Sequence, residues 1–220
     1  MEVLILLIGI ENMLLTLAGK RPVFHSEADF QHALAWEIHL QNPACSLRLE
    51  YKPPFVSQRV YLDVFIRASN SEGISAIELK YKTRGLRVQV DRETFSLLDQ
   101  SAQDIARYDF LKDISRLEQV ISCADNGVGY AIFLTNDSAY WKPPLIRETV
   151  DADFRIHQGR VLNGTLKWKS NASKGTTHGR EETISIQGSY HLKWQDYSKP
   201  SEASYGQFKY LLVKVTSEDT

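Results

Sequence analysis

Residues 74–82, with the sequence ISAIELKYK, alternate between apolar and charged side chains, and this alternation constrains the fold more than any other feature. In an extended strand, successive side chains point to opposite faces of the sheet. One face therefore carries apolar side chains and the other charged ones: Ile77, Leu79 and Tyr81 against Glu78, Lys80 and Lys82. Taken alone, this pattern is typical of a solvent-facing strand with neutralised charges, so a functional role needs support from the rest of the chain.

Composition indicates an ordinary globular protein. The chain has 220 residues, of which 43% are hydrophobic and 24% are charged, enough for one sizeable core. We expect a single domain over 1–220, with an N-terminal apolar helix in 1–22, a core in 23–145 and a β-rich extension in 146–220 packed on it. The formal net charge of -1 argues against a surface coated in basic residues. Any nucleic-acid site must therefore be local.

The cysteines and the N-terminal segment bear on the location of the protein. Cys45 and Cys123 form no C-x-x-C pattern, so neither a zinc site nor a disulfide framework is indicated, and a reducing cytoplasm fits best. The first twenty residues are apolar, but Glu2 stands where a signal peptide has a basic residue, and Glu11 and Asn12 interrupt the run. We expect a buried or dimer-forming helix, with no membrane span and a homodimer as one option.

A helix, three strands, a helix and a strand follow in order. Residues 27–42 have helical apolar spacing after an N-cap at Ser26, and 45–51, 58–68 and 74–82 are rich in strand-forming residues. The polar turn 69–73 predicts a hairpin between the last two strands. Residues 96–123 contain no Gly or Pro and predict one long helix or two consecutive ones, and the apolar run in 126–137 predicts a strand buried on both faces.

Beyond Trp141 the chain becomes β-rich. Asn163-Gly164 lies between strand-forming runs and predicts a hairpin, and further strands are expected in 182–194 and 208–215. Residues 169–182 are polar and predict a loop.

Two acids and a lysine lie on the predicted hairpin. Asp63 is on one strand and Glu78 and Lys80 are on the next, joined by a short turn. Two converging carboxylates repel each other unless a divalent cation lies between them, and oxygen-only ligands suit Mg²⁺ or Mn²⁺. Lys80 could then orient or help to deprotonate a water for attack on a phosphodiester. The alternative is a structural salt bridge between Asp63 and Lys80 without a metal.

In this pattern the chain resembles the PD-(D/E)XK nuclease superfamily over about residues 23–136. The resemblance rests on LD at Leu62-Asp63, IELK at 77–80, and SEADFQ at 26–31. One departure is Leu62, which stands where a proline usually precedes the first acid. The resemblance implies a restriction-endonuclease-like α/β fold, a mixed central sheet flanked by helices. It also implies that Asp63, Glu78 and the carbonyl of Leu79 ligate the metal and that Lys80 is the catalytic lysine.

The first helix contributes further candidates. The segment SEADFQ is similar to the S-E-x-x-x-Q helix start of virus-type replication-repair nucleases, which implies a catalytic role for Glu27. Taken alone, Glu27 would be explained by the helix dipole. Gln31, four residues on, would lie on the same face and could orient water or phosphate. Glu37 is the rival to Glu27, because it also lies near the apolar side of the helix. Gln31, Lys82 and Arg84 are candidate nucleic-acid contacts.

These features lead to one main expectation and two alternatives. The main one is a cytoplasmic, Mg²⁺- or Mn²⁺-dependent deoxyribonuclease acting in restriction, defence or repair, with DNA as its partner. The first alternative is a catalytically inactive, nuclease-like module that binds nucleic acid or protein. The second is a small-molecule binding protein whose β-rich tail forms the pocket. The absence of a phosphate-cradling glycine loop gives this alternative little support.

Overall fold

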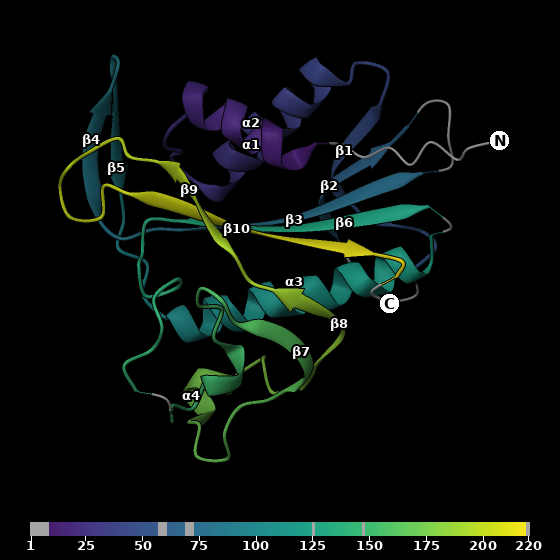
Figure 1. Cartoon of the computed structure of the whole chain (residues 1–220), viewed down its shortest axis with the longest axis vertical. Coiled ribbons are helices and arrows are strands. Elements are labelled where there is room, and N and C mark those ends of the chain that lie inside the picture. Colours follow the sequence, from purple (N-terminus) through teal and green to yellow (C-terminus); the bar gives the residue numbers. More distant parts are fainter. Residues whose placement is uncertain (1–8, 57–60, 69–72, 125, 147, 219–220) are drawn as a thin grey trace.

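A six-stranded mixed sheet with helices on both faces forms the centre of the computed structural model, which describes residues 9–56, 61–68, 73–124, 126–146 and 148–218 (Figure 1). The strand order is β1-β2-β3-β6-β10-β9. Helices α1 (Ile10–Lys20) and α2 (Glu27–Gln41) cover one face, and α3 (Gln103–Ser122) covers the other. The predicted α/β class, with a mixed sheet between helices, is confirmed.

The first four strands of the sheet follow the predicted order. Strands β1 (Ser46–Tyr51), β2 (Leu62–Arg67) and β3 (Ile74–Lys82) form an antiparallel meander, and β6 (Gly127–Thr135) lies parallel to β3 on its other side. The predicted β2–β3 hairpin and the fully buried strand β6 are both confirmed. Strand β3 therefore lies inside the sheet, with its charged residues enclosed by neighbouring elements.

The two N-terminal helices pack together on one face of the sheet, with α2 against β3 and α1 against the edge strand β9 (Trp194–Ser198). The Ser26 side chain caps α2 by accepting a hydrogen bond from the Asp29 N–H, and α2 ends at Gln41, as predicted. Helix α1 is buried along one side, which confirms the expected buried helix within residues 10–20; Glu2 lies outside the described residues. Among the residues described, no helix is both long and apolar enough to cross a membrane.

Two local predictions are wrong. The predicted helix over 96–123 begins only at Gln103, because residues before it form a hairpin of β4 (Leu86–Val90) and β5 (Glu93–Leu97). The inward side chains of this hairpin are buried and are spaced two residues apart on each strand, as expected for strands: Leu86, Val88, Phe95 and Leu97.

The second correction concerns Asn163-Gly164. These residues lie within β7 (Val161–Leu166), which pairs with β8 (Ile184–His191), and they make no turn. Gly164 has a φ of 72°, and the pairing register shifts between Leu162 and Gly164. Gly164 thus allows an irregularity in the strand pairing. This irregularity needs the same left-handed backbone conformation as a tight turn.

The C-terminal part of the chain contacts both the sheet and α3. Strands β9 (Trp194–Ser198) and β10 (Phe208–Thr216) extend the central sheet, with β10 antiparallel to β6. The β7–β8 pair packs beneath α3, together with the 3₁₀ turn η1 (Ala152–Phe154) and the short helix α4 (Lys174–Thr177) (Figure 1). Helix α3 is therefore enclosed between the sheet and this second layer.

Close contact between α3 and the sheet occurs at Gly129 of β6. A Cβ atom at this position would lie 3.2 Å from the Cβ atoms of both Leu117 and Val215. The absent side chain lets the helix approach the sheet closely, which brings the inner side chains of α3 onto β3.

Candidate active site

The site is built where the β2–β3 ladder stops. The last pair of that ladder is Val64 with Ile77, and β3 continues to Lys82. Two carboxylates then accept hydrogen bonds from the backbone of β3: Asp63 Oδ2 from the Leu79 N–H at 2.6 Å, and Glu27 Oε2 from the Tyr81 N–H at 2.7 Å. Strand hydrogen bonding is thus replaced by side-chain carboxylates at this edge, which places Asp63 and Glu27 along the same short stretch of β3.

Lys80 projects from β3 toward α3. Its Nζ lies 2.7 Å from Oδ2 of Asp113 and 3.1 Å from the carbonyl oxygen of Leu79. Asp113 is 3% exposed and also accepts a hydrogen bond from Arg116 at 2.8 Å. The alternative of an Asp63–Lys80 salt bridge is not what forms: within the described ranges, Asp63 has no ion-pair partner.

Asp113 is the residue that sequence reasoning missed. Its neighbours on the inner side of α3, Phe110, Ile114 and Leu117, are fully buried apolar residues. An acid in such a stripe needs a buried cation or hydrogen-bond donors. An acid within an apolar helical stripe can be recognised in the sequence, but this pattern does not indicate which strand supplies the cation.

Glu78 is the most constrained carboxylate of the site. It is 4% exposed, and its Oε1 atom is buried without a hydrogen-bond partner among the described residues. Burial raises the pKa of Glu78 well above its usual range, and the charges of Asp113 and Asp63 raise it further against the opposing effect of Lys80. An unsatisfied buried carboxylate is costly unless it binds a proton or a cation.

The pKa of Asp63 is also raised. Burial raises its pKa to about 6, against the lowering effect of the Leu79 N–H and of the Lys80 charge. The charges of Asp113 and Glu27 contribute to the rise. The acids of the site therefore repel one another in the absence of a cation.

Lys80 remains a cation in this environment. Burial by itself would lower its pKa, but the adjacent carboxylate of Asp113, with Glu27 and Asp63, outweighs burial and raises it. Lys80 is consequently suited to stabilise negative charge and unsuited to accept a proton.

Gln31 connects the helix to the site. Its Nε2 donates to Glu50 Oε1 and to the Asp63 carbonyl oxygen, both at 2.8 Å, and the side chain is buried. Gln31 therefore fixes the backbone at Asp63, which differs from the direct contact with water or phosphate expected from the sequence. Glu50, in β1, adopts a φ of 49°, unusual for a residue with a side chain.

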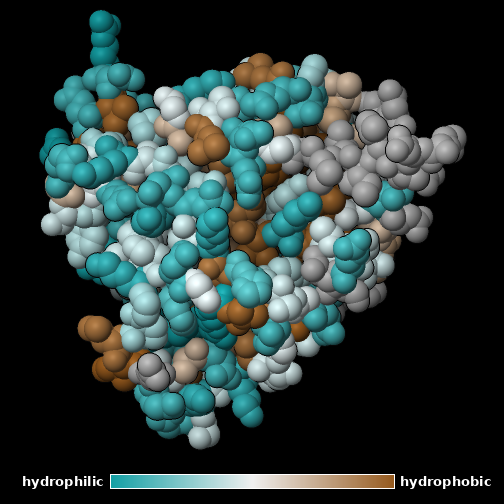
Figure 2. Space-filling view, in the orientation of Figure 1, coloured by the Kyte–Doolittle hydropathy of each residue, from teal (hydrophilic) through white to brown (hydrophobic). Residues whose placement is uncertain are grey.

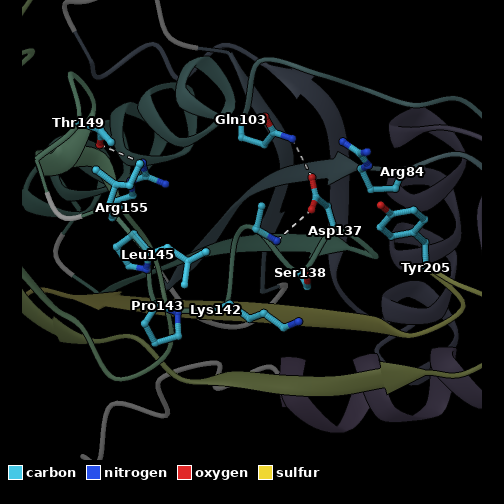
Figure 3. Close-up of a pocket in the computed structure, with 13 residues that line it drawn as sticks. Arg84, Gln103, Asp137, Ser138, Lys142, Pro143, Leu145, Thr149, Arg155 and Tyr205 are labelled. Atoms are coloured by element: carbon cyan, nitrogen blue, oxygen red, sulfur yellow. Dashed lines mark hydrogen bonds between the residues drawn. The ribbon is translucent and has the colours of Figure 1, made fainter.

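The remaining sequence candidates divide into two groups. Glu37 is buried away from the site and pairs with Lys20 of α1 at 2.8 Å, so it serves the packing of α1 on α2. Lys82 is half-buried at the end of β3. Arg84 lies outside the acidic cluster and lines a separate pocket (Figure 3). Its Nε is 3.1 Å from Asp99 Oδ1.

The atoms that could bind a metal at β3 are all oxygens, which suits a hard divalent cation. Asp63, Glu78 and the Leu79 carbonyl offer oxygen only, and the unpartnered Oε1 of Glu78 supplies an unused acceptor. In the part of the chain that the structure describes, no group of three or more His, Cys, Asp or Glu side chains is arranged to hold a metal ion. Two carboxylates and one carbonyl would leave the other positions to water, as Mg²⁺ commonly requires.

No protein-family model, curated protein or solved structure matches the chain.

Proposed function

We propose that the protein is a metal-dependent nuclease that hydrolyses phosphodiester bonds in DNA, with a restriction-endonuclease-like core formed by α2, β1, β2, β3, α3 and β6. The observation that carries the proposal is that Asp63 lies close enough to Glu78 for its charge to raise the Glu78 pKa, while Glu78 is buried and its Oε1 has no hydrogen-bond partner among the described residues. Mutual repulsion and burial raise the pKa of both carboxylates, as expected for groups that bind a divalent cation.

In this proposal Asp63, Glu78 and the Leu79 carbonyl would hold Mg²⁺ or Mn²⁺. The bound ion would polarise the phosphate and lower the pKa of the attacking water. Lys80, kept protonated by Asp113, would stabilise the negative charge that develops on the phosphoryl oxygens. Glu27 and Gln31 would hold the edge of β3 and the Asp63 backbone in position.

The runner-up is a nuclease-like scaffold without catalysis, acting as a nucleic-acid or protein interaction module. It is favoured by the contacts that the polar groups make inside the protein. Asp63 and Glu27 cap backbone N–H groups, and Lys80 pairs with Asp113, so much of the cluster is satisfied without a ligand.

Calorimetric titration separates the two proposals. Mn²⁺ and Mg²⁺ are titrated into the parent protein and into an Asp63→Ala, Glu78→Ala variant whose fold is checked by circular dichroism. The matched control is Glu148→Ala, Glu218→Ala, two exposed acids outside the site. The nuclease proposal predicts metal binding and DNA cleavage by the parent and the control but not by the site variant. A parent that binds no metal, even with DNA present, would establish the scaffold.

A further inference from the structure

A pocket of about 680 Å³ lies at the carboxyl ends of β3 and β6, next to the acidic cluster but separate from it. Figure 3 shows Arg84 and Tyr205 at one side, Arg155 with Thr149 at the other, and Lys142 and Leu145 between them. Because Arg84 follows Lys80 by four residues, their Cα atoms are at most about 14 Å apart. A single DNA strand could contact both places.

The charge of this pocket is mainly positive. Among its described lining residues there are three cations, Arg84, Lys142 and Arg155, and one carboxylate, Asp137. Both oxygens of Asp137 already accept hydrogen bonds, from Gln103 Nε2 at 3.0 Å and from the Ala139 N–H at 2.9 Å (Figure 3). Asp137 is thus satisfied by hydrogen bonds within the protein, and it keeps one negative charge against the three positive charges of the lining.

The three cations are incompletely neutralised. Arg155 shares the carboxylate of Asp151 with the buried Arg107, at 3.1 and 2.9 Å, so one negative charge faces two positive ones. Arg84 pairs with Asp99, which is 57% exposed, and such exposed pairs are weak. Lys142 has no ion-pair partner within the described residues.

Apolar groups stand beside the cations. Leu145 is fully exposed and Ile146 is 68% exposed, and Figure 2 shows a hydrophobic patch projecting at the lower left, over the segment that follows β6. Tyr205 is 42% exposed, and the guanidinium of Arg84 lies 5.1 Å from the centre of its ring. A ligand that uses both features carries an anion and a flat apolar surface.

We infer that this pocket binds one nucleotide of the substrate strand, with the phosphate at Arg84 and Lys142 and the base against Leu145 and Tyr205. This assignment rests on the proposed nuclease function and adds a contact beside the reacting centre. Phosphate recognition by cationic side chains combined with base stacking on aromatic or apolar groups is the usual mode for a single strand. The pocket would then fix the position of the strand relative to Lys80.

The test is calorimetric titration of the full chain with thymidine 5′-monophosphate, thymidine and inorganic phosphate, in the presence of a chelator. The nucleotide is expected to bind at least tenfold more tightly than either fragment. Arg84→Gln and Lys142→Gln should each weaken nucleotide binding about tenfold. Leu145→Ser should weaken binding of the nucleotide and leave binding of phosphate unchanged. Lys214→Gln, an exposed cation on β10, is the matched control and should have no effect.

Failure of this inference can be distinguished from failure of the nuclease proposal. The Asp63→Ala, Glu78→Ala variant should retain nucleotide binding, because neither side chain lines the pocket. The inference is overturned if the nucleotide does not bind, if phosphate alone binds equally tightly, or if the Arg84 and Lys142 variants behave like Lys214→Gln. A parent that binds nucleotide but no metal would refute the nuclease and leave the pocket in place.

Discussion

The ammonium of Lys80 lies 2.7 Å from the carboxylate of Asp113, so a strand lysine is held by an acid of the helix that packs on it. The two side chains are 17% and 4% exposed, respectively, and Arg116 approaches the same carboxylate. In a buried pair of this kind each charge depends on the other, because solvation by water has been lost. The pair therefore connects the stability of the fold to the charge state of the candidate site.

Asp113→Leu should lower the free energy of unfolding by about 3 to 5 kcal/mol, because it leaves a buried ammonium without its counterion. Adding Lys80→Met removes the unpaired charge, so the double variant should be more stable than Asp113→Leu alone. Urea denaturation of the parent, both single variants and the double variant measures the coupling. Purely additive effects would contradict the pairing.

Asp63→Asn should stabilise the metal-free protein at neutral pH relative to the parent. The pKa of Asp63 is about 6 in the folded state against 3.8 for the ordinary group, so the folded state holds its proton more tightly. The parent therefore loses stability as the pH rises from about 4 to about 6, and the variant does not.

The difference in unfolding free energy between Asp63→Asn and the parent should grow by up to about 3 kcal/mol over that interval. Urea midpoints at pH 4 and pH 7, measured with a chelator present, provide the check. Glu78→Gln should change in the same direction, because the pKa of Glu78 is also raised. A difference that stays constant with pH would rule out this account of Asp63.

Gln31→Met should destabilise the protein by about 1 to 3 kcal/mol, because the buried carbonyl of Asp63 loses its donor. Gln119→Met is the matched control: Gln119 is exposed on helix α3, and its effect should be within about 0.5 kcal/mol. If the nuclease proposal holds, Gln31→Met also lowers DNA cleavage through displacement of Asp63. Equal stability of the two variants would show that the Gln31 contacts contribute nothing.

Two glycines should respond in opposite ways to alanine. In Gly206→Ala the new Cβ would overlap the Ser201 carbonyl oxygen, so the loop before β10 must shift, at a cost of about 1 to 3 kcal/mol or more. Gly19, in helix α1, has nothing within 4 Å of its added Cβ, and alanine should stabilise the helix by about 0.5 to 1 kcal/mol. Thermal unfolding of both variants tests the loop and the helix together; a rise in Tm for Gly206→Ala would be inconsistent with this backbone approach.

Much of the fold could be predicted because its elements have strong local signals. Ser26 marks the start of α2, the alternation in 74–82 marks β3, and the continuous apolar run marks β6. The β4–β5 hairpin was missed because its strands are only five residues each, so its alternation of apolar and polar residues covers a short stretch of sequence. At Asn163-Gly164 the local signal was real, but a left-handed glycine serves a strand irregularity as well as a turn.

The sequence by itself determined α2, the order of strands β1, β2, β3 and β6, and the placement of Glu78 and Lys80 on one face of β3, because backbone periodicity is a local property. Only the tertiary structure decided which charges meet. Asp113 is 33 residues from Lys80 along the chain, and their contact depends on how closely α3 approaches the sheet at Gly129. The pocket likewise joins Arg84 to Tyr205, which lies 121 residues further along the chain and is brought back because β10 runs beside β6. Such contacts arise from packing between distant segments, which no local pattern encodes.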